Sequence, residues 1–130
     1  MNHMKVNGHE IKPGANLQGT DLRGADLTAD ANLQSTDLKG ANLQDADLLR
    51  ANLQGTDLQG ADLRDANLRR AGLYSVNLQE ANLQGAILYH ANLTNADLKG
   101  AILSPDMIWK YAKELSVAKN LDKAVLKVQQ

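Results

Sequence analysis

Positively charged side chains recur at a regular spacing in the middle of the chain. Arg50 and Arg70 are separated by twenty residues, and His90 follows Arg70 at the same interval. Arg69 and Tyr89 directly precede two members of this series. A fold that stacks every twentieth residue would bring these cations together, where they repel one another unless an anion lies between them. The five residues are therefore our candidate binding site, and the expected ligand is an anionic partner.

Two interpretations of this candidate site are open. In the simpler one, the cations form ion pairs with Asp45 and Asp65, one repeat earlier in the chain, on a solvated corner where each pair contributes little stability. In the other, the cations bind a partner, and Ile87 and Tyr89 add an apolar spot beside them.

The sequence contains no catalytic or metal-binding pattern. The three histidines, His3, His9 and His90, lack the spacing of metal ligands, and no nucleophile elbow or phosphate-binding glycine loop occurs. The chain has no cysteine, which excludes disulfides and thiolate chemistry. We expect no cofactor and no enzymatic activity.

The elements that position the candidate residues come from one five-residue phrase, approximately Ala-(Asp/Asn)-Leu-X-X. Its central leucines are Leu17, Leu22 and Leu27, followed after a six-residue step at Asp30 by an unbroken ladder of leucines that ends at Leu103. We expect each Asp or Asn to hydrogen-bond nearby backbone at a corner. Calcium binding is a less simple explanation for the many aspartates. Asn often replaces Asp at this position, so the repeat does not specify a cluster of carboxylates.

A period of five suits neither a helix nor a straight strand. On an α-helix the leucines would advance by about 500° per repeat and form no apolar stripe. In a strand, an odd spacing would send alternate leucines to opposite faces. A chain that turns one corner per repeat points every Leu inward, and four corners close a square coil. Such coils would stack about 4.8 Å apart, as paired strands do.

The phrase resembles that of the pentapeptide-repeat family, as residues 51–60 (ANLQGTDLQG) illustrate. The resemblance covers about 90 of the 130 residues. It implies an all-β solenoid, the right-handed quadrilateral β-helix of that family. The regular Ala-Asn-Leu phrase and the tail at residues 117–124 are similar to cyanobacterial members.

Internal similarity supports a coil of twenty residues, because residues 31–50 align with residues 51–70. Residues 15–30 depart from this pattern and look like the same unit shortened to sixteen. Asp30 therefore marks either a bulge or a deletion of four residues, and the register of the first coil against the later ones is left open.

Both ends of the ladder change composition, as solenoid caps require. We expect an N-terminal cap at residues 1–14, where Asn7-Gly8 predicts a hairpin and the first residues resemble a tag remnant. The repeat β-helix follows at residues 15–104. We expect a C-terminal helical cap at residues 105–130, with Ser104 as N-cap and Pro105 in the first turn.

The C-terminal cap has two predicted contributions to the end of the solenoid. Its helix presents Met107, Ile108, Tyr111 and Leu115 on one face, which we expect to cover Ile87, Tyr89, His90 and Ile102. Leu121 and Leu126 again stand five apart, which predicts one further degenerate repeat.

Composition limits the function classes. The formal net charge of −1 and the absence of a strong basic stripe argue against direct nucleic-acid binding. No apolar run approaches the roughly 18 residues of a membrane span, and the N-terminus lacks the apolar core of a signal peptide. We expect a cytoplasmic protein without membrane contact, either a monomer or a weak dimer through an end cap.

The combined expectation is a non-enzymatic rigid scaffold that presents a surface for protein–protein interaction or regulation. The alternative comes from the family resemblance, because some members modulate type II topoisomerases by imitating duplex DNA. Asp37, Asp57 and Asp97, which share one face, would carry that mimicry. The lack of phenylalanine and the mild overall charge make it the second choice.

Overall fold

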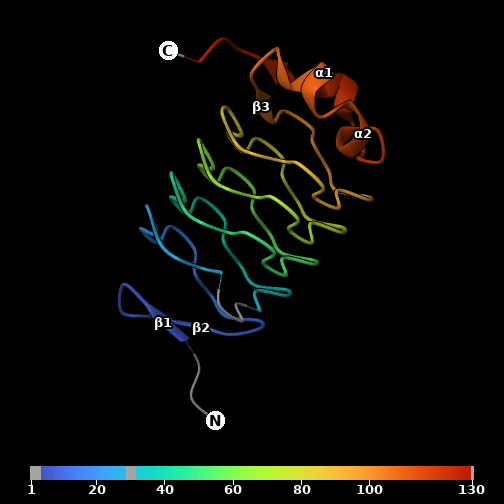
Figure 1. The fold of residues 1–130 in the computed structure, drawn as a ribbon. Helices are drawn as coiled ribbons and strands as arrows, with labels where there is room; N and C mark the ends of the chain where they lie inside the picture. Colours follow the sequence, from blue (N-terminus) through green and yellow to red (C-terminus); the bar gives the residue numbers. More distant parts are fainter. Residues whose placement is uncertain (1–3, 29–31, 130) are drawn as a thin grey trace.

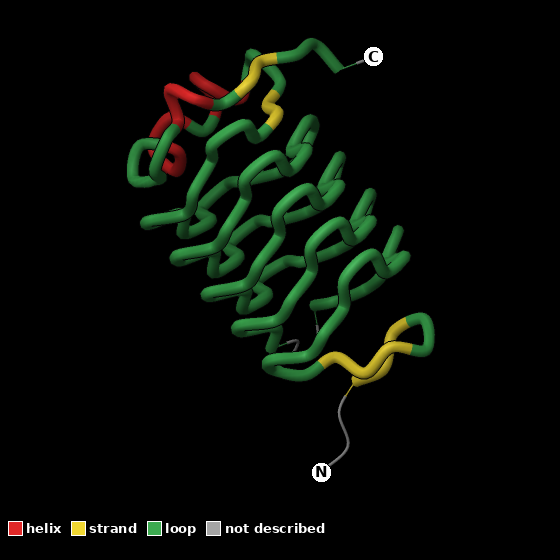
Figure 2. Tube along the Cα trace, turned by 180° about the vertical axis from the view of Figure 1, so that it is seen from behind, coloured by secondary structure: helices red, strands yellow, loops and turns green. Residues whose placement is uncertain are grey.

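The computed structural model describes residues 4–28 and 32–129 and shows a stack of four-sided coils (Figure 1). From residue 32 onward, single parallel bridges join positions twenty residues apart, as between Asn32 and Asn52 or between Asp57 and Asn77. The N–H of Leu58 donates to the Asn77 carbonyl at 2.8 Å. The predicted coil of twenty residues is confirmed. Because most bridges are single, nearly all of the solenoid is drawn as loop in Figure 2.

Every corner has the same hydrogen-bond pattern. The Ala61 N–H donates to the Leu58 carbonyl at 3.0 Å and closes a β-turn. The residue before that Ala, Gly60, is left-handed with φ +68°. The Asp57 side chain accepts the Gln59 N–H at 3.1 Å. An equivalent bond occurs in each repeat that carries Asp or Asn at this position, so the predicted backbone role of these side chains is confirmed.

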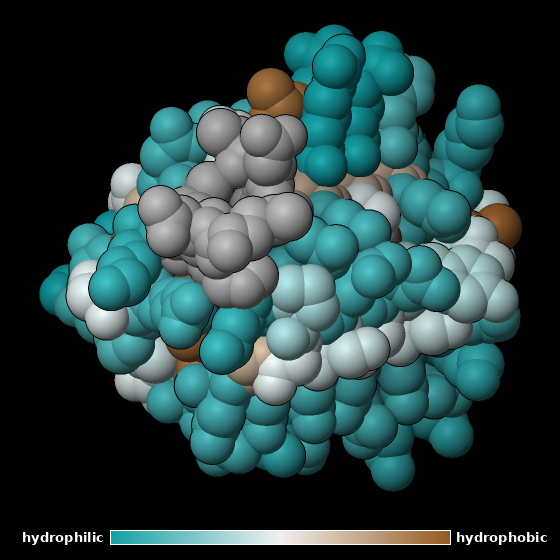
Figure 3. Space-filling model, turned by 90° about the horizontal axis from the view of Figure 1, so that it is seen from below, coloured by the Kyte–Doolittle hydropathy of each residue, from teal (hydrophilic) through white to brown (hydrophobic). Residues whose placement is uncertain are grey.

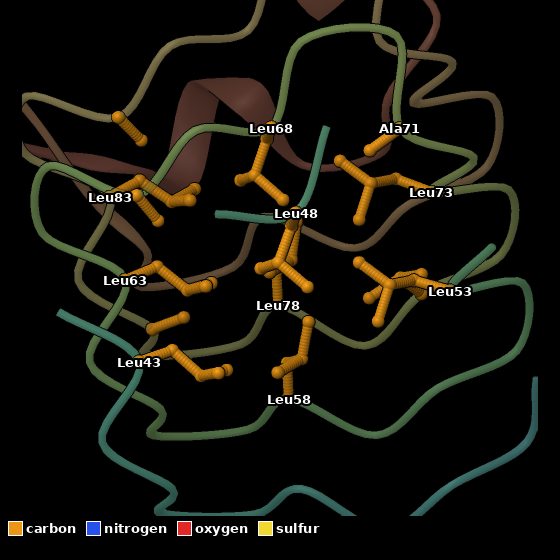
Figure 4. Packing of buried hydrophobic residues seen from close by; sticks show 14 of the residues in the cluster. Leu43, Leu48, Leu53, Leu58, Leu63, Leu68, Ala71, Leu73, Leu78 and Leu83 are labelled. Carbon is orange, nitrogen blue, oxygen red and sulfur yellow. The ribbon is translucent and has the colours of Figure 1, made fainter. Parts of the chain in front are cut away.

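The interior consists of stacked leucine columns (Figure 4). Leu43, Leu63 and Leu83 form one column, and each has 0% of its surface exposed. Burial of each leucine contributes about 1.5–3 kcal/mol relative to exposure. Thr36 and Thr56 replace the usual alanine in one column, and both hydroxyls donate to the Leu33 carbonyl, at 2.7 and 2.8 Å. The buried hydroxyls are therefore satisfied.

The first coil has a register of its own. Asn16, Asp21 and Asp26 bridge to Asp37, Asn42 and Asp47, so partners here are twenty-one residues apart. The interpretation that this coil had lost four residues is wrong. The register changes from twenty-one to twenty residues between Asp26 and Asn32, and Asp30, where the sequence allowed a bulge, lies outside the described residues.

A hairpin covers the N-terminal end. Strand β1 (Met4–Val6) pairs antiparallel with β2 (His9–Ile11), and Asn7 and Gly8 both have positive φ, +50° and +79°. Two such residues define the type I′ turn that Asn-Gly favours. The predicted hairpin is confirmed, and Ile11 joins the core with 4% exposure. Seen from this end, the surface is mostly hydrophilic (Figure 3).

Two short helices cover part of the C-terminal end. Helices α1 (Met107–Lys110) and α2 (Ala112–Leu115) meet at Tyr111, whose φ of −118° and ψ of 32° interrupt the helix. Met107, Tyr111 and Leu115 are buried, as predicted. No helix in the part of the chain that the structure describes has the length and apolar character needed to cross a membrane.

Two details of this cap differ from the sequence expectation. The Ser104 hydroxyl caps no helix and has no partner among the described residues, because the helix begins at Met107 with Asp106 as its N-cap, two residues after Ser104. Ile108 is 36% exposed rather than covered, because only the side chains at Met107, Tyr111 and Leu115 face the coil.

The chain closes with one more rung. Strand β3 (Ile102–Leu103) pairs in parallel with β4 (Val125–Leu126) after the 3₁₀ turn η1 (Leu121–Lys123). The predicted degenerate repeat is confirmed. It extends the ladder beyond the last regular leucine.

Candidate functional site

The structure brings the predicted cations onto one side of the solenoid. Leu48, Leu68 and Leu88 stack inside this side, which we call the basic face, and Asp47 and Asn67 are bridged on its outside. The Arg50 N–H donates to the Arg69 carbonyl and the Arg70 N–H to the Tyr89 carbonyl, each at 3.0 Å. Arg50, Arg70 and His90 thus occupy equivalent corners of successive coils.

An open depression of about 440 Å³ lies on the basic face. We call it the basic groove; the residues that line it are Thr28, Leu49, Arg50, Asn67, Arg69 and Arg70. Three arginines therefore line one surface. Leu49 contributes a half-buried apolar side chain.

The arginines of the groove have no carboxylate partner in the part of the chain that the structure describes. Among residues 4–28 and 32–129, no salt bridge involves Arg50, Arg69 or Arg70. The predicted ion pairs with Asp45 and Asp65 do not form there, and Asp65 instead accepts a hydrogen bond from the Gln129 amide at 3.0 Å. The described residues therefore do not show the simpler interpretation, in which Asp45 and Asp65 neutralise the arginines.

For Arg69 the reason lies in the residue two positions earlier, whereas Arg50 and Arg70 have a buried leucine at that place, Leu48 and Leu68. Arg23 and Arg64 pair with Asp21 and Asp62 in this relation, at 2.8 and 2.7 Å. These contacts lower the pKa of both carboxyl groups, for Asp21 to about 2. Before Arg69 the equivalent residue is an asparagine. Its neutral amide leaves the guanidinium charge uncompensated.

The corners of the basic face also have an unfavourable backbone conformation. Arg50, Arg70 and His90 are all left-handed, with φ of 61°, 58° and 61°. A residue with a Cβ atom costs about 1–2 kcal/mol in this region, whereas glycine is free of that cost. Glycine occupies most corners of the opposite face, as at Gly40 and Gly60. The long cationic side chains are therefore present despite the local backbone preference.

Tyr89 and His90 belong to a different environment from the arginines. The Tyr89 ring packs edge-on against the Tyr111 ring, with centroids 4.9 Å apart. The backbone N–H of His90 donates to the Glu114 carboxylate at 2.8 Å. Burial raises the pKa of Tyr111. The cap thus ends the column at its third corner, and the five predicted residues divide into an open arginine groove and a capped Tyr89–His90 pair.

The predicted cover over the end of this face is only partial. Tyr89 and Ile87 keep 42% and 39% of their surface exposed, although Tyr111 lies against the first. Ile102 is half-buried because it pairs with Val125 in the last rung. The cap lies at the predicted end of the solenoid but covers less of this face than the sequence predicts.

The side that carries Asp37, Asp57 and Asp97, which we call the acidic face, neutralises its own charge. The Lys39 ammonium lies 3.5 Å from Asp37 and 3.6 Å from Asp57. The Asn120 amide donates to Asp97 at 2.8 Å and is the main cause of its lowered pKa. The acidic face is therefore interrupted by one lysine and by neutral amides and does not form a continuous anionic strip.

Thr28 and Asn67 line the groove but were not among the predicted site residues. Asn67 could have been found from the sequence, since it is an Asn where the other repeats with Arg at this position carry Asp. Thr28 could not, because its place beside Leu49 depends on the twenty-one-residue register. In the described residues, no group of three or more His, Cys, Asp or Glu side chains lies close enough together to hold a metal ion.

These features define a β-solenoid with a cationic groove. Comparison of the sequence with known protein families identifies the family. Residues 13–28, 31–70 and 66–104 match the model for pentapeptide repeats, in eight copies. The chain belongs to the pentapeptide-repeat family, and its fold is the right-handed quadrilateral β-helix. No curated protein matches it.

One solved structure supports the fold, and two others are similar to the chain in part. A pentapeptide repeat protein from the cyanobacterium Cyanothece 51142 is 30% identical with a TM-score of 0.69, over 88% of this chain and 82% of that one. HetL from the cyanobacterium Nostoc, a protein involved in heterocyst differentiation regulation, is 42% identical with a TM-score of 0.32, over 70% of this chain and 46% of HetL. The fluoroquinolone resistance protein QnrB1 is 16% identical with a TM-score of 0.42, over 79% of this chain and 66% of QnrB1. The low TM-scores of the last two support no functional inference.

Proposed function

We propose that this chain is a non-enzymatic scaffold that presents a rigid surface to a partner protein, and that the basic groove is the docking site. The observation that carries the proposal is the uncompensated state of Arg50, Arg69 and Arg70 among the described residues, on a fold whose other arginines pair within their own repeats. Charged groups left without an internal partner are available for an external one.

The solenoid suits this role because it is preorganised. Each coil hydrogen-bonds to the coils on both sides, and the interior is filled with leucine. A rigid surface loses little conformational entropy on binding. In the residues that the structure describes, leucine fills the interior, and the basic groove is open to solvent, which favours binding over catalysis.

Imitation of duplex DNA is the second candidate function, and its support is weaker. Mimicry needs an uninterrupted row of negative charge, but Lys39 lies between Asp37 and Asp57, and Asn77 takes the next position in that column. A supercoiling assay with a type II topoisomerase tests it directly. Inhibition that disappears when Asp37, Asp57 and Asp97 are changed to Asn would favour mimicry over the scaffold.

The experiment for the scaffold is affinity capture from a lysate of the source cells. Wild-type protein is compared with an Arg50→Glu, Arg70→Glu variant and with a Lys39→Glu, Lys99→Glu variant, which has the same net charge but leaves the groove intact. Mass spectrometry should identify a protein retained by the wild type and by the second variant only. Equal recovery on all three would show that the groove is not the docking site.

A further inference from the structure

We infer that the basic groove recognises a short acidic segment of a protein, with two carboxylates on alternate residues of an extended chain that runs along the solenoid axis. This inference rests on the proposed function and specifies the chemistry of the partner. It follows from the charge, the length and the surroundings of the groove.

The charge of the groove requires an anionic ligand with more than one acceptor group. Arg50 and Arg70 lie on successive coils, and Arg69 adjoins Arg70. Nearby Asp47 does not compensate them, since its carboxylate accepts bonds from the Leu49 N–H and the Asn67 amide, both at 3.2 Å. Guanidinium groups bind carboxylates through paired hydrogen bonds, so each coil of the groove offers a carboxylate position.

The length of the groove limits the ligand to two such positions. At the third corner of the column, the cap supplies its own carboxylate, because Glu114 accepts the His90 N–H. Adjacent coils are about 4.8 Å apart at the backbone, and repulsion between the guanidinium groups spreads their tips further. Alternate side chains of an extended peptide are about 6.6–6.8 Å apart on one side, somewhat more than the coil spacing, so two of them can face arginines of successive coils.

The surroundings of the groove exclude a long polyanion. Asp45 and Asp65 occupy the neighbouring row of corners, and both are exposed. A nucleic acid that extended beyond the groove would meet these carboxylates, and the chain has a net charge of −1 rather than the excess of positive charge typical of nucleic-acid binders. A short acidic protein segment avoids that repulsion. The half-buried Leu49 offers contact to the methylene groups of its glutamates.

The test uses fluorescence anisotropy with labelled peptides and the full chain. We expect saturable binding of a peptide with a central Glu-Ala-Glu, weakened about tenfold by the Arg50→Glu, Arg70→Glu changes and also weakened by added salt. The Lys39→Glu, Lys99→Glu variant, with equal net charge, should bind as the wild type does. Thermal unfolding of each variant checks that it is folded.

Three peptide controls make the inference specific. A Gln-Ala-Gln peptide should not bind, and a peptide with its two glutamates separated by five alanines should bind more weakly than Glu-Ala-Glu. Equal binding of the two glutamate peptides, or tighter binding of a single-stranded oligonucleotide, would overturn the inference. If lysate capture depends on the groove while no glutamate peptide binds, the scaffold function stands and the acidic-segment inference fails.

Discussion

The basic and acidic faces share one backbone but treat charge in opposite ways. On the acidic face, Lys39 lies between two aspartates and the corners are mostly glycine. On the basic face, Arg50 and Arg70 occupy left-handed corners and have no salt bridge in the described part of the chain. The repeat specifies the coil, whereas the exposed positions of each repeat decide whether a face is self-contained or available for binding.

The largest expected effect is a loss of stability when a buried leucine is shortened, and it tests whether the interior is the same behind both faces. Leu58→Ala on the acidic face and Leu68→Ala on the basic face remove equally buried side chains, both 0% exposed. Each should lower the free energy of unfolding by about 2–5 kcal/mol, since both leave a cavity in the leucine stack. Chemical denaturation of both variants measures the loss. A much smaller loss on one face would show that the interiors differ.

The corner residues should produce opposite effects on the two faces. Gly60 has φ +68°, and a Cβ atom added there would meet nothing within 4 Å, so Gly60→Ala should destabilise the fold by about 1 kcal/mol through backbone strain alone. Arg70→Gly should keep or raise stability, by up to about 1 kcal/mol, because it removes that strain. Thermal unfolding measures both. Loss of stability in Arg70→Gly would mean that this arginine serves the fold.

One substitution should give the basic face an ion pair within its own repeat. Asn67→Asp places a carboxylate two residues before Arg69, the relation that Asp62 has to Arg64. Stability should change by less than about 1 kcal/mol, since an exposed pair contributes little. Binding of the Glu-Ala-Glu peptide should fall severalfold by anisotropy. Asn77→Asp, outside the groove, is the control, and equal weakening by both would point to a general charge effect.

The smallest expected effect concerns the link between the acidic face and the cap. The pKa of Asp97 is lowered from 3.8, so the stability it contributes is present above about pH 3.8 and is lost as the pH falls through its folded value. Asp97→Asn should therefore reduce the loss of thermal stability between pH 5 and about pH 2.5. The exposed Asp122, whose side chain makes no hydrogen bond among the described residues, provides the control as Asp122→Asn. Equal pH profiles for wild type and Asp97→Asn would contradict the assignment.

Particular residues show how far the sequence alone predicts this protein. The leucine ladder predicted the coil, the Asn7-Gly8 pair predicted the hairpin, and the spacing of Leu121 and Leu126 predicted the last rung. These three predictions are confirmed because each depends on a pattern that spans only a few neighbouring residues. Ser104 is not the cap because the helix begins two residues later than the sequence predicts, after Asp106, and the start of a helix depends on how it meets the coil.

By itself, the sequence determined the period, the inward columns and the alignment of Arg50, Arg70 and His90, because a five-residue repeat with four corners leaves little freedom to the backbone. Only the tertiary structure decided the register of the first coil and the partners of the charged side chains. An insertion can be absorbed at any one of several corners, and a long side chain reaches residues on neighbouring coils. Contacts between segments far apart in the sequence place Thr28 in the groove beside Leu49. They also bring Glu114 of the cap to the backbone of His90.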